Sequence, residues 1–244
     1  MTISPAGDSA VWVEFGNEIS LSLNDRVHSL AKSLKEKPLR GVVDLVPAYA
    51  SLLVCYDPML IPGKKLSSAL ASRAKKKTGT GPGQGRVVGI PVCYGGDFAP
   101  DMDAVRAHTG FSRDEVIARH TAPLYRIYML GFLPGFPYLG GLDPALETPR
   151  LETPRTKIPA GSVGIGGAQT GIYPLESPGG WRIIGRTPLK PYDPERAEPF
   201  LYRAGDSIRF YPVSRDQYDR IANNSIADDG MANDGITNNN TAGI

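Results

Sequence analysis

The sequence predicts two domains, a small α+β domain followed by a larger, mainly β domain. At residues 74–86, basic residues give way to Gly, Thr and Pro with no apolar residue to bury, which is typical of a linker. Before this segment, β-rich and helical patterns alternate. After it, residues 131–213 hold short β-rich runs separated by Gly and Pro, which favours a closed or strongly curved antiparallel sheet. We therefore place the domains at residues 1–77 and 86–221, with the linker at 78–85.

In the first domain we expect the order strand, helix, two strands, helix. Val27, Leu30 and Leu34 recur at the spacing of one helix face, and Ser22 and Asn24 are candidate caps for that helix. The three expected strands and the apolar residues of the second helix are Ala10–Phe15, Val42–Ala48, Ser51–Tyr56, and Leu66, Ala69 and Leu70.

In the second domain, two short helices are expected before the β-rich part. The first covers Asp101–His108 and is ended by Gly110, and the second begins with the capping box Ser112-x-x-Glu115. Strands are expected at Val87–Val92 and Tyr125–Leu130. The final stretch, Ala222–Ile244, is rich in Asn, Asp and Gly without periodicity, and we predict that it is disordered.

Composition excludes several classes of function. The 244 residues carry 27 basic and 25 acidic side chains, a formal net charge of +2, which gives no electrostatic reason to expect a nucleic acid or membrane partner. No window is long and apolar enough to span a bilayer, and no signal-peptide pattern opens the chain. Both cysteines, Cys55 and Cys93, lie in apolar segments, which argues against a disulfide framework and favours a cytoplasmic location.

The stretch "GIGGAQTGIYPLESPGGW", residues 164–181, does not have the pattern of a phosphate loop. Gln169 stands where the last glycine of a dinucleotide motif would be, no Lys-Ser or Lys-Thr follows, and Pro174 and Pro178 oppose a helix. Ser162 lacks the first glycine and the following helix of a nucleophile elbow, so it is interpreted as a turn hydroxyl. We predict two strands with connecting turns that border a groove.

The sequence offers no metal site, and one histidine remains a candidate for function. His28, His108 and His120 share no short metal-ligand spacing, and neither cysteine belongs to a C-x-x-C pair. His120 closes the second short helix just before the strand that leads into "GFLPGFPYLGG". It is therefore either a functional residue that points toward the glycine-rich rim or a plain helix-end histidine.

Side chains suited to a binding groove gather in the Gly- and Pro-rich region. Aromatic residues, Arg and Gln serve stacking and orientation in small-molecule and peptide sites. The duplicated segment "LETPRLETPR", residues 146–155, is interpreted as an extended segment that presents two arginines. The alternative is that the aromatic residues fill a barrel and the arginines are solvated. The candidates are Phe132, Phe136, Tyr138, Arg150, Arg155, Lys157, Gln169, Tyr173, Ser177, Gly179, Gly180 and Trp181.

These residues carry a resemblance to a known family. "GFLPGFPYLGGL", "IPAGSVGIGGAQTGIYPLESPGGWRIIGRTP" and "GDSIRF" resemble the bacterial family of 5-oxoprolinase B subunits, also called the KipI or allophanate hydrolase subunit 1 family. The resemblance is strong over residues 87–213, and "SPAGDSAVWVEFG" and "IPVCYGG" agree more weakly. It implies a cyclophilin-like β-barrel in the second domain and a small α+β domain before it.

The resemblance also implies a function. Such proteins act with two partners, an A subunit and a carboxyltransferase-like C subunit, in an ATP-dependent 5-oxoprolinase, which opens the lactam of 5-oxo-L-proline to give L-glutamate. This chain is then expected to be inactive alone and to bind no cofactor itself, with ATP used by the assembled complex. In that reaction we assign catalytic roles to His120, Lys157 and Gln169, with Arg155 as a further donor to developing charge.

Two other roles remain open. The same family includes an inhibitor that binds a sporulation histidine kinase, and a barrel of this type alone would suggest a peptidyl-prolyl isomerase, although no isomerase motif is present. The chain departs from the family at Pro191-Tyr192, where Leu-Phe usually precedes Asp-Pro. This change keeps an aromatic residue and adds a rigid one, so we expect it to affect a local contact, such as one at a subunit interface.

Overall fold

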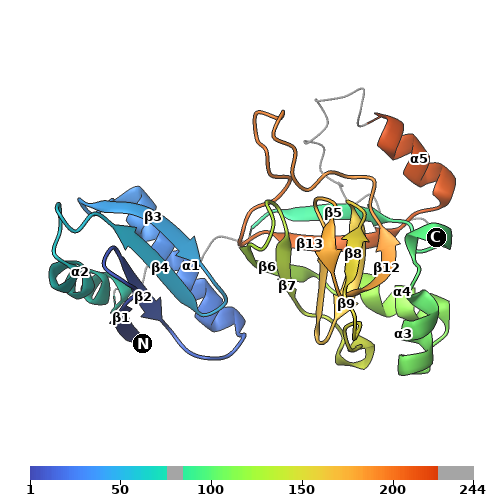
Figure 1. The fold of residues 1–244 in the computed structure, drawn as a ribbon, viewed down its shortest axis with the longest axis horizontal. Coiled ribbons are helices and arrows are strands. Elements are labelled where there is room, and N and C mark those ends of the chain that lie inside the picture. Colours follow the sequence, from blue (N-terminus) through green and yellow to red (C-terminus); the bar gives the residue numbers. More distant parts are fainter. Residues whose placement is uncertain (76–84, 225–244) are drawn as a thin grey trace, which may run out of the picture.

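The computed structural model describes residues 1–75 and 85–224, and it shows a mixed α+β protein with two lobes (Figure 1). The first lobe holds a four-stranded antiparallel sheet in the order β1-β2-β4-β3, with two helices. Its elements are β1 (Thr2–Pro5), β2 (Ala10–Glu14), α1 (Leu21–Glu36), β3 (Val42–Pro47), β4 (Ser51–Tyr56) and α2 (Gly63–Lys75). All three predicted strands and both helices are confirmed, and β1 is an addition.

Alternation of apolar residues explains how the first sheet packs. Along β2 and β4, every second side chain is buried, including Val11, Val13 and Val54. Val27 and Leu34 of α1 are buried in the same core. The buried face of the strands, which holds every second residue, therefore packs against the apolar face of the helices, as the sequence indicated.

The expected caps of α1 are wrong. The helix begins one residue after Ser20, which is its N-cap, so Ser22 and Asn24 lie inside the first turn. Asn24 is fully buried, and its Nδ2 donates to the carbonyl oxygens of Ala48 at 3.2 Å, Tyr49 at 3.1 Å and Tyr128 at 3.2 Å. Because Tyr128 belongs to the second lobe, this side chain joins the two lobes.

Further contacts support the joint between the lobes. Nε2 of His28 donates to the same Tyr128 carbonyl at 2.8 Å, and Asp25 lies 3.5 Å from the guanidinium of Arg126. The ring of Tyr49, in the turn between β3 and β4, lies 5.4 Å from the ring of Tyr128. Helix α1 and this turn therefore hold the first lobe against β6 of the second.

The second lobe contains three sheets, and the two larger ones share its main core. A four-stranded sheet has the order β5-β13-β6-β7, a three-stranded sheet β10-β9-β12, and β8 pairs with β11. All pairs are antiparallel except β5 with β13. The strands are β5 (Val87–Val92), β6 (Tyr125–Leu130), β7 (Pro137–Gly140), β8 (Arg155–Ile158), β9 (Ser162–Gly166), β10 (Gln169–Ile172), β11 (Ser177–Gly179), β12 (Arg182–Arg186) and β13 (Ser207–Pro212).

This topology confirms the predicted β-rich character but not a closed barrel. Ile90 of β5, Ile127 of β6, Ile165 of β9 and Ile184 of β12 are buried in one shared core, so the two larger sheets pack together. Over residues 85–224, however, the strands form three separate sheets. An isolated bridge between Cys93 and Arg186 links the ends of β5 and β12. A single closed sheet therefore stays a prediction.

Both predicted short helices are confirmed, and one helix is unexpected. Helix α3 (Met102–Thr109) ends at Gly110, which has a left-handed φ of 76°, and α4 (Arg113–Thr121) has the Ser112–Glu115 capping box. Two short 3-10 helices, η1 (Gly96–Phe98) and η2 (Pro144–Leu146), complete this part. The unexpected helix, α5 (Arg215–Asn224), has no fully buried residue, and its apolar stripe is limited to the half-buried Tyr218, Ile221 and Ala222.

Two predictions on chain organisation lie mostly outside the described residues. Helix α5 extends to residue 224, so it includes the first three residues of the segment that we expected to be disordered from 222. The rest of that segment, 225–244, and residues 78–84 of the expected linker are not described. None of the described helices is both long and apolar enough to cross a membrane.

We predict that Asn24→Ala weakens the joint between the lobes. The substitution removes the side-chain donor from the carbonyl groups of Ala48 and Tyr49, while the Tyr128 carbonyl keeps its hydrogen bond from His28. An unpaired buried polar group costs about 1–2 kcal/mol. Urea unfolding should therefore show a loss of this size in the free energy of unfolding. Asn17→Ala, at an exposed position before α1, is the control and should change stability little. Equal stabilities of the two variants would contradict the bridging role of Asn24.

Candidate functional site

The glycine-rich stretch forms a platform for the ring of Trp181. A Cβ atom on Gly166 of β9 would lie 2.5 Å from Cδ1 of the indole, and one on Gly171 of β10 would lie 3.1 Å from Cζ3. A Cβ on Gly164 would lie 3.4 Å from Cβ of Trp181. The indole is only 6% exposed. Gly166 and Gly171 are therefore needed because a large ring lies directly on the strand backbone. The stretch is extended, as predicted, but it contains the end of β9 and the whole of β10 and β11, three strands where two were predicted.

Trp181 belongs to a compact group that we call the aromatic cluster, which consists of Phe136, Ile158, Tyr173, Trp181 and Ile183. Phe136 lies 5.5 Å from the rings of both Tyr173 and Trp181, and all three pairs are edge-to-face. Such pairs contribute about 0.5–1.5 kcal/mol each beyond their burial. Tyr138 lies 5.3 Å from Phe136 at the margin of the cluster. Four predicted site residues are thus brought together.

Three predicted cations, Arg150, Arg155 and Lys157, lie close to this cluster, and we call them the basic rim. The guanidinium of Arg150 lies 5.8 Å from the centroid of the Trp181 ring, within reach of a cation–π contact. Arg155 makes two hydrogen bonds, of 2.7 and 2.9 Å, with the buried carboxylate of Asp101. Among the described residues, Arg150 is the one member of the rim without an ion pair.

The other two cations are held by their acidic partners. Asp101 also accepts a hydrogen bond of 2.6 Å from the backbone N–H of Ile183, so the Arg155 pair fastens β8 to β12. Nζ of Lys157 lies 3.0 Å from Oε1 of Glu176, and both side chains are exposed. The Arg155 pair is therefore structural, whereas the exposed Lys157 pair is weak and easily exchanged.

Polar groups on the β11 side of the cluster have unusual surroundings. Burial raises the pKa of Tyr173, and the nearby charges of Arg150 and Arg155 oppose this shift. Oγ of Ser177 is buried and has no hydrogen-bond partner in the part of the chain that the structure describes. A Cβ on Gly179 would lie 2.5 Å from Oη of Tyr173, so this glycine lets β11 approach the ring. A buried hydroxyl without a partner is rare and calls for an explanation.

Gln169 meets a residue that sequence analysis missed. Its Nε2 donates a hydrogen bond to Oη of Tyr49 from the first lobe. The Tyr49 ring also lies 5.9 Å from Tyr138, and burial raises its pKa to about 12. The neutral hydroxyl of Tyr49 therefore fixes the Gln169 amide at the margin of the cluster. No local pattern marks Tyr49, because its partner is 120 positions away.

His120 lies in the core and not at the groove. It is fully buried, its Nδ1 lies 2.8 Å from Oη of Tyr94, and its Nε2 lies 2.8 Å from Oγ1 of Thr170. Because Thr170 donates its own proton to the Gly164 carbonyl, the imidazole donates through Nε2 and accepts from Tyr94 through Nδ1. Burial lowers its pKa to about 3. This position contradicts the interpretation that His120 points toward the rim, because both ring nitrogens make hydrogen bonds inside the core.

Ser162 also differs from its interpretation as a turn hydroxyl. It is the first residue of β9 and is fully buried, and its Oγ has no hydrogen-bond partner among the described residues. In the same described part of the chain, no group of three or more His, Cys, Asp or Glu side chains could hold a metal ion. Cys55 and Cys93 are both free thiols.

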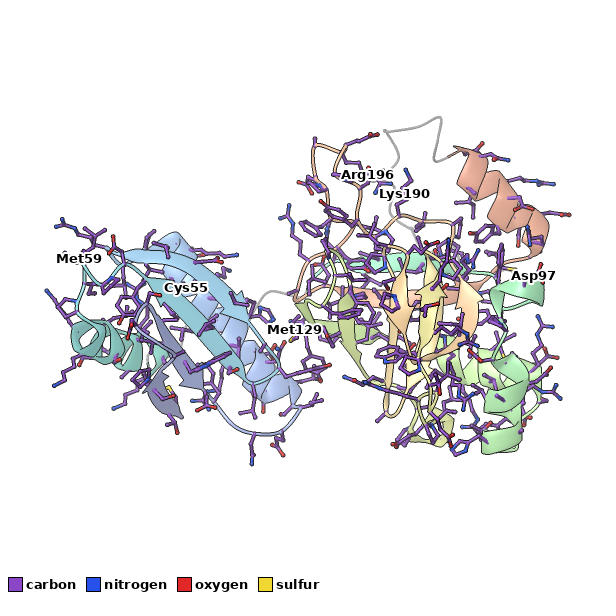
Figure 2. The ribbon with its side chains drawn as sticks, viewed as in Figure 1. Cys55, Met59, Asp97, Met129, Lys190 and Arg196 are labelled. Atoms are coloured by element: carbon purple, nitrogen blue, oxygen red, sulfur yellow. The ribbon has the colours of Figure 1, made fainter. Side chains whose placement is uncertain are left out.

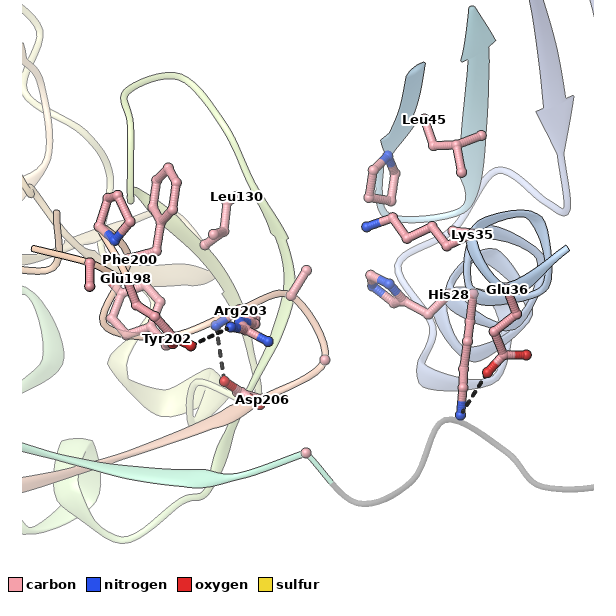
Figure 3. A pocket seen from close by; sticks show the side chains of 18 residues that line it. His28, Lys35, Glu36, Leu45, Leu130, Glu198, Phe200, Tyr202, Arg203 and Asp206 are labelled. Atoms are coloured by element: carbon pink, nitrogen blue, oxygen red, sulfur yellow. Dashed lines mark hydrogen bonds and ion pairs between the residues drawn. The ribbon is translucent and has the colours of Figure 1, made fainter. Parts of the chain in front are cut away.

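A separate cleft of about 700 Å³ lies between the lobes (Figure 3). His28 and Lys35 of α1 line one side, and Leu130, Phe200 and Tyr202 line the other. None of the residues that line it belongs to the aromatic cluster or the basic rim. Two of the cationic side chains that line the cleft, Lys32 and Arg203, form ion pairs with Glu36 and Glu198. The geometry therefore favours the aromatic cluster and the basic rim as the candidate site.

Comparison with known proteins identifies the family. Residues 1–202 match the family described as carboxyltransferase domain, subdomain C and D. The chain is 42% identical to the 5-oxoprolinase B subunit of Bacillus subtilis over 226 residues, which are 88% of this chain and 94% of that protein. The protein of the same name from Escherichia coli O157:H7 is also 42% identical, over 84% of this chain and 93% of its own length. The chain belongs to the 5-oxoprolinase B-subunit family.

A solved structure supports the family assignment and differs from this chain in its length. The crystal structure of TTHA0988 is 41% identical, with a TM-score of 0.75 over 84% of this chain. This chain spans only 40% of that solved chain. The fold of the 5-oxoprolinase B-subunit family thus occurs in TTHA0988 as part of a longer polypeptide. The family prediction from the glycine- and proline-rich motifs is confirmed.

We predict that Gly166→Ala disrupts the seat of Trp181. The new methyl group would meet the indole, and overpacking of this kind costs about 1–3 kcal/mol. Guanidinium unfolding should show this loss in the free energy of unfolding, together with a shift in tryptophan emission.

Gly180→Ala is the matched control for this glycine. The nearest atoms to a Cβ at Gly180 lie 3.7 Å away, which is an ordinary contact. This variant should retain native stability and emission. If Gly166→Ala were as stable as Gly180→Ala, the platform would not be the reason for the glycine pattern.

We predict that His120 makes the fold sensitive to acid. Its pKa is about 3 when folded and near 6.5 when unfolded, so the unfolded chain binds more protons between these values. Stability is therefore fully present above about pH 6.5 and is lost as the pH falls toward 3, by about 2 kcal/mol between pH 6.5 and 4.5. His120→Gln should reduce this difference in chemical unfolding. Burial lowers the pKa of His28 as well, so exposed His108 is the control, and His108→Gln should keep the native pH dependence.

Proposed function

We propose that this chain is the B subunit of an ATP-dependent 5-oxoprolinase, which opens 5-oxo-L-proline to L-glutamate together with its A and C subunits. The observation that carries this proposal is the match to curated 5-oxoprolinase B subunits over 93–94% of their length. A match of this extent includes both lobes and the whole candidate site. These relatives are named as one lettered subunit of an enzyme, which supports a complex of several polypeptides.

The internal pairing of the site supports a role that depends on partners. Arg155 is bound to Asp101, Lys157 to Glu176, and Gln169 to Tyr49. Opening a lactam requires hydrogen-bond donors directed at the oxygen on which charge develops, in a place from which water is excluded. These three donors face partners within the chain, which supports a reactive site that another polypeptide completes.

We assign the recognition of the substrate carboxylate to Arg150. Its guanidinium is exposed, has no ion pair among the described residues, and is held near the face of Trp181. An arginine fork matches a carboxylate with two parallel hydrogen bonds. The apolar cluster beneath it lowers the local dielectric and strengthens that contact. Arg150 thus holds the substrate, while Lys157 and Gln169 remain the proposed donors in the assembled enzyme.

Ser177 and His120 receive different roles. The unpaired Oγ of Ser177 is proposed to bond a polar atom of the bound substrate, since leaving it unpaired costs free energy in the isolated chain. His120 is proposed as a positioning residue instead of a proton-transfer group. Through Thr170 it fixes the carbonyl of Gly164, and with it the platform under Trp181.

The remaining parts of the proposal concern fold, cofactor and location. We propose that the sheets of the second lobe form a cyclophilin-like barrel, in which the bridge between Cys93 and Arg186 supports closure between two sheets. The chain binds no cofactor alone, and ATP is used by the assembled complex, which acts in the cytoplasm. Inhibition of a histidine kinase stays the alternative, and co-purification separates the two: recovery of the A and C subunits supports the enzyme, and recovery of a kinase without them supports the inhibitor.

The proposal is tested by reconstitution of the three subunits. We expect ATP-dependent conversion of 5-oxo-L-proline to glutamate with the native chain and none without it. Arg150→Gln should raise KM for 5-oxo-L-proline about tenfold, because a hydrogen bond to a charged group contributes about 1.5 kcal/mol or more. Arg209→Gln, at an exposed arginine of β13, is the control and should leave KM unchanged.

Two results would contradict this assignment. Failure of the native complex to convert 5-oxo-L-proline would overturn the proposed function. An unchanged KM in Arg150→Gln would overturn the role of the basic rim while leaving the function in place. Ser177→Ala provides a second check in the same assay, since it removes an unpaired group and should lower kcat/KM without lowering the stability of the isolated chain.

A further inference from the structure

The loop between β6 and β7, residues 131–136, contains an unusual backbone turn. Phe132 has a φ of +66°, and it is the one non-glycine residue with positive φ among residues 1–75 and 85–224. The backbone N–H of Leu133 donates to the carbonyl of Gly131 at 2.8 Å, which closes a three-residue γ-turn around Phe132. The γ-turn with positive φ is rare and strained. For a bulky residue, such a conformation costs of order 1–3 kcal/mol.

The surrounding loop is built to hold this turn. Phe136 N donates to the Leu133 carbonyl at 3.0 Å, which closes a second turn through Pro134 and Gly135. Gly135 has a φ of 81°, and its carbonyl accepts from Oη of the buried Tyr202 at 2.9 Å. The positions of proline and glycine suit a type II turn. The loop is therefore rigid, and the strain at Phe132 persists because its neighbours fix the backbone.

The Pro191-Tyr192 pair packs against the same loop. A Cβ on Gly135 would lie 2.9 Å from Cβ of Tyr192 and 3.2 Å from the carbonyl oxygen of Pro191. Tyr192 in turn packs 5.2 Å from the ring of Phe200. The backbone of Pro191 and the Cβ of Tyr192, at the position where the chain departs from the family pattern, thus pack directly against the turn at Gly135.

Folding alone gives little reason for a phenylalanine at position 132. Its side chain is 63% exposed, and within the loop its ring meets only the edge of Phe136, at 5.5 Å. A glycine would adopt the same backbone without strain. Met59 is even more exposed, at 90%, at the end of the first lobe remote from the second (Figure 2), but its backbone has no such strain. Exposure combined with strain singles out Phe132, and such a combination is typical of a functional contact.

We propose that Phe132 is an anchor that inserts into an apolar pocket of the C subunit, the carboxyltransferase-like partner. This inference rests on the proposed function. Rigid exposed aromatic side chains are the usual anchors of protein interfaces, because little entropy is lost when they become buried. The loop forms one surface with the aromatic cluster, since Leu133 packs against it and Phe136 belongs to it. Docking at Phe132 therefore places the C subunit beside the basic rim.

The comparisons favour this occupant over a second copy of the chain. The matched family is described as subdomains C and D of a carboxyltransferase domain, a description that implies further subdomains of the same domain. In TTHA0988, the same fold at 41% identity occupies 40% of a longer chain. There, this unit is joined to additional polypeptide of the same molecule. A partner that supplies the remaining carboxyltransferase subdomains accounts for both observations.

The test separates the fold from the interface by means of Phe132→Gly. Glycine relieves the strained φ, so the isolated variant should unfold at the same or a higher denaturant concentration than the native chain. Its affinity for the purified C subunit, measured by titration calorimetry, should fall at least tenfold, as for an interface hot spot. Phe132→Tyr keeps the aromatic anchor and should bind within about threefold of the native chain. Met59→Ala, far from the loop, is the control for exposed apolar residues.

Each outcome decides a different question. Native affinity in Phe132→Gly would overturn the inference and leave the proposed function intact. A loss of stability in Phe132→Gly would also overturn it, because the side chain would then serve the fold. If the native chain itself neither bound the C subunit nor supported conversion of 5-oxo-L-proline, both the proposed function and this inference would fail.

Discussion

The contact between the Trp181 indole and the bare backbone of β9 and β10 determines the shape of the candidate site. Glycine in a strand costs about 0.5–1 kcal/mol relative to alanine, and two glycines, Gly166 and Gly171, meet this ring. Burying an indole of about 200 Å² contributes several kcal/mol, which exceeds that cost. Because the ring occupies the face of the strands, Phe136 and Tyr173 can pack against its edges and Arg150 can lie over it.

The same hairpin receives contacts from both lobes. Thr170 of β10 is fixed from the core by His120, and the adjacent Gln169 is bonded to Tyr49 of the first lobe. Asn24 joins the turn that carries Tyr49 to β6. A shift of the first lobe would therefore reach the margin of the aromatic cluster through one hydrogen bond. The lobe contact is part of the site and not merely a connection beside it.

Local patterns in the sequence revealed most helices and strands. The Ser112–Glu115 capping box and the apolar spacing in α1 depend on neighbouring residues, and both gave the right element. Helix α5 offers only three half-buried apolar residues over a single turn, which is too short a pattern to have predicted a helix. The side of the fold that His120 faces depends on how α4 packs on β13, and no local pattern contains that information. The Tyr49–Gln169 bond joins residues 120 positions apart, which single-sequence reasoning cannot connect.

The family motif itself contains two kinds of information that the sequence alone does not separate. In "GIGGAQTGIYPLESPGGW", Gly166, Gly171 and Gly179 are explained by packing inside this chain, because the side chain of Trp181 or Tyr173 lies against their backbone. In "GFLPGFPYLGG", Gly135 is explained by its turn and its contact with Tyr192, whereas the exposed, strained Phe132 has no such internal reason. A residue that weakens its own chain, yet is held rigidly by its neighbours, is best understood through a contact outside that chain. The structure thus divides the motif into a part that shapes the site and an exposed residue, Phe132, that we propose as a contact to a partner.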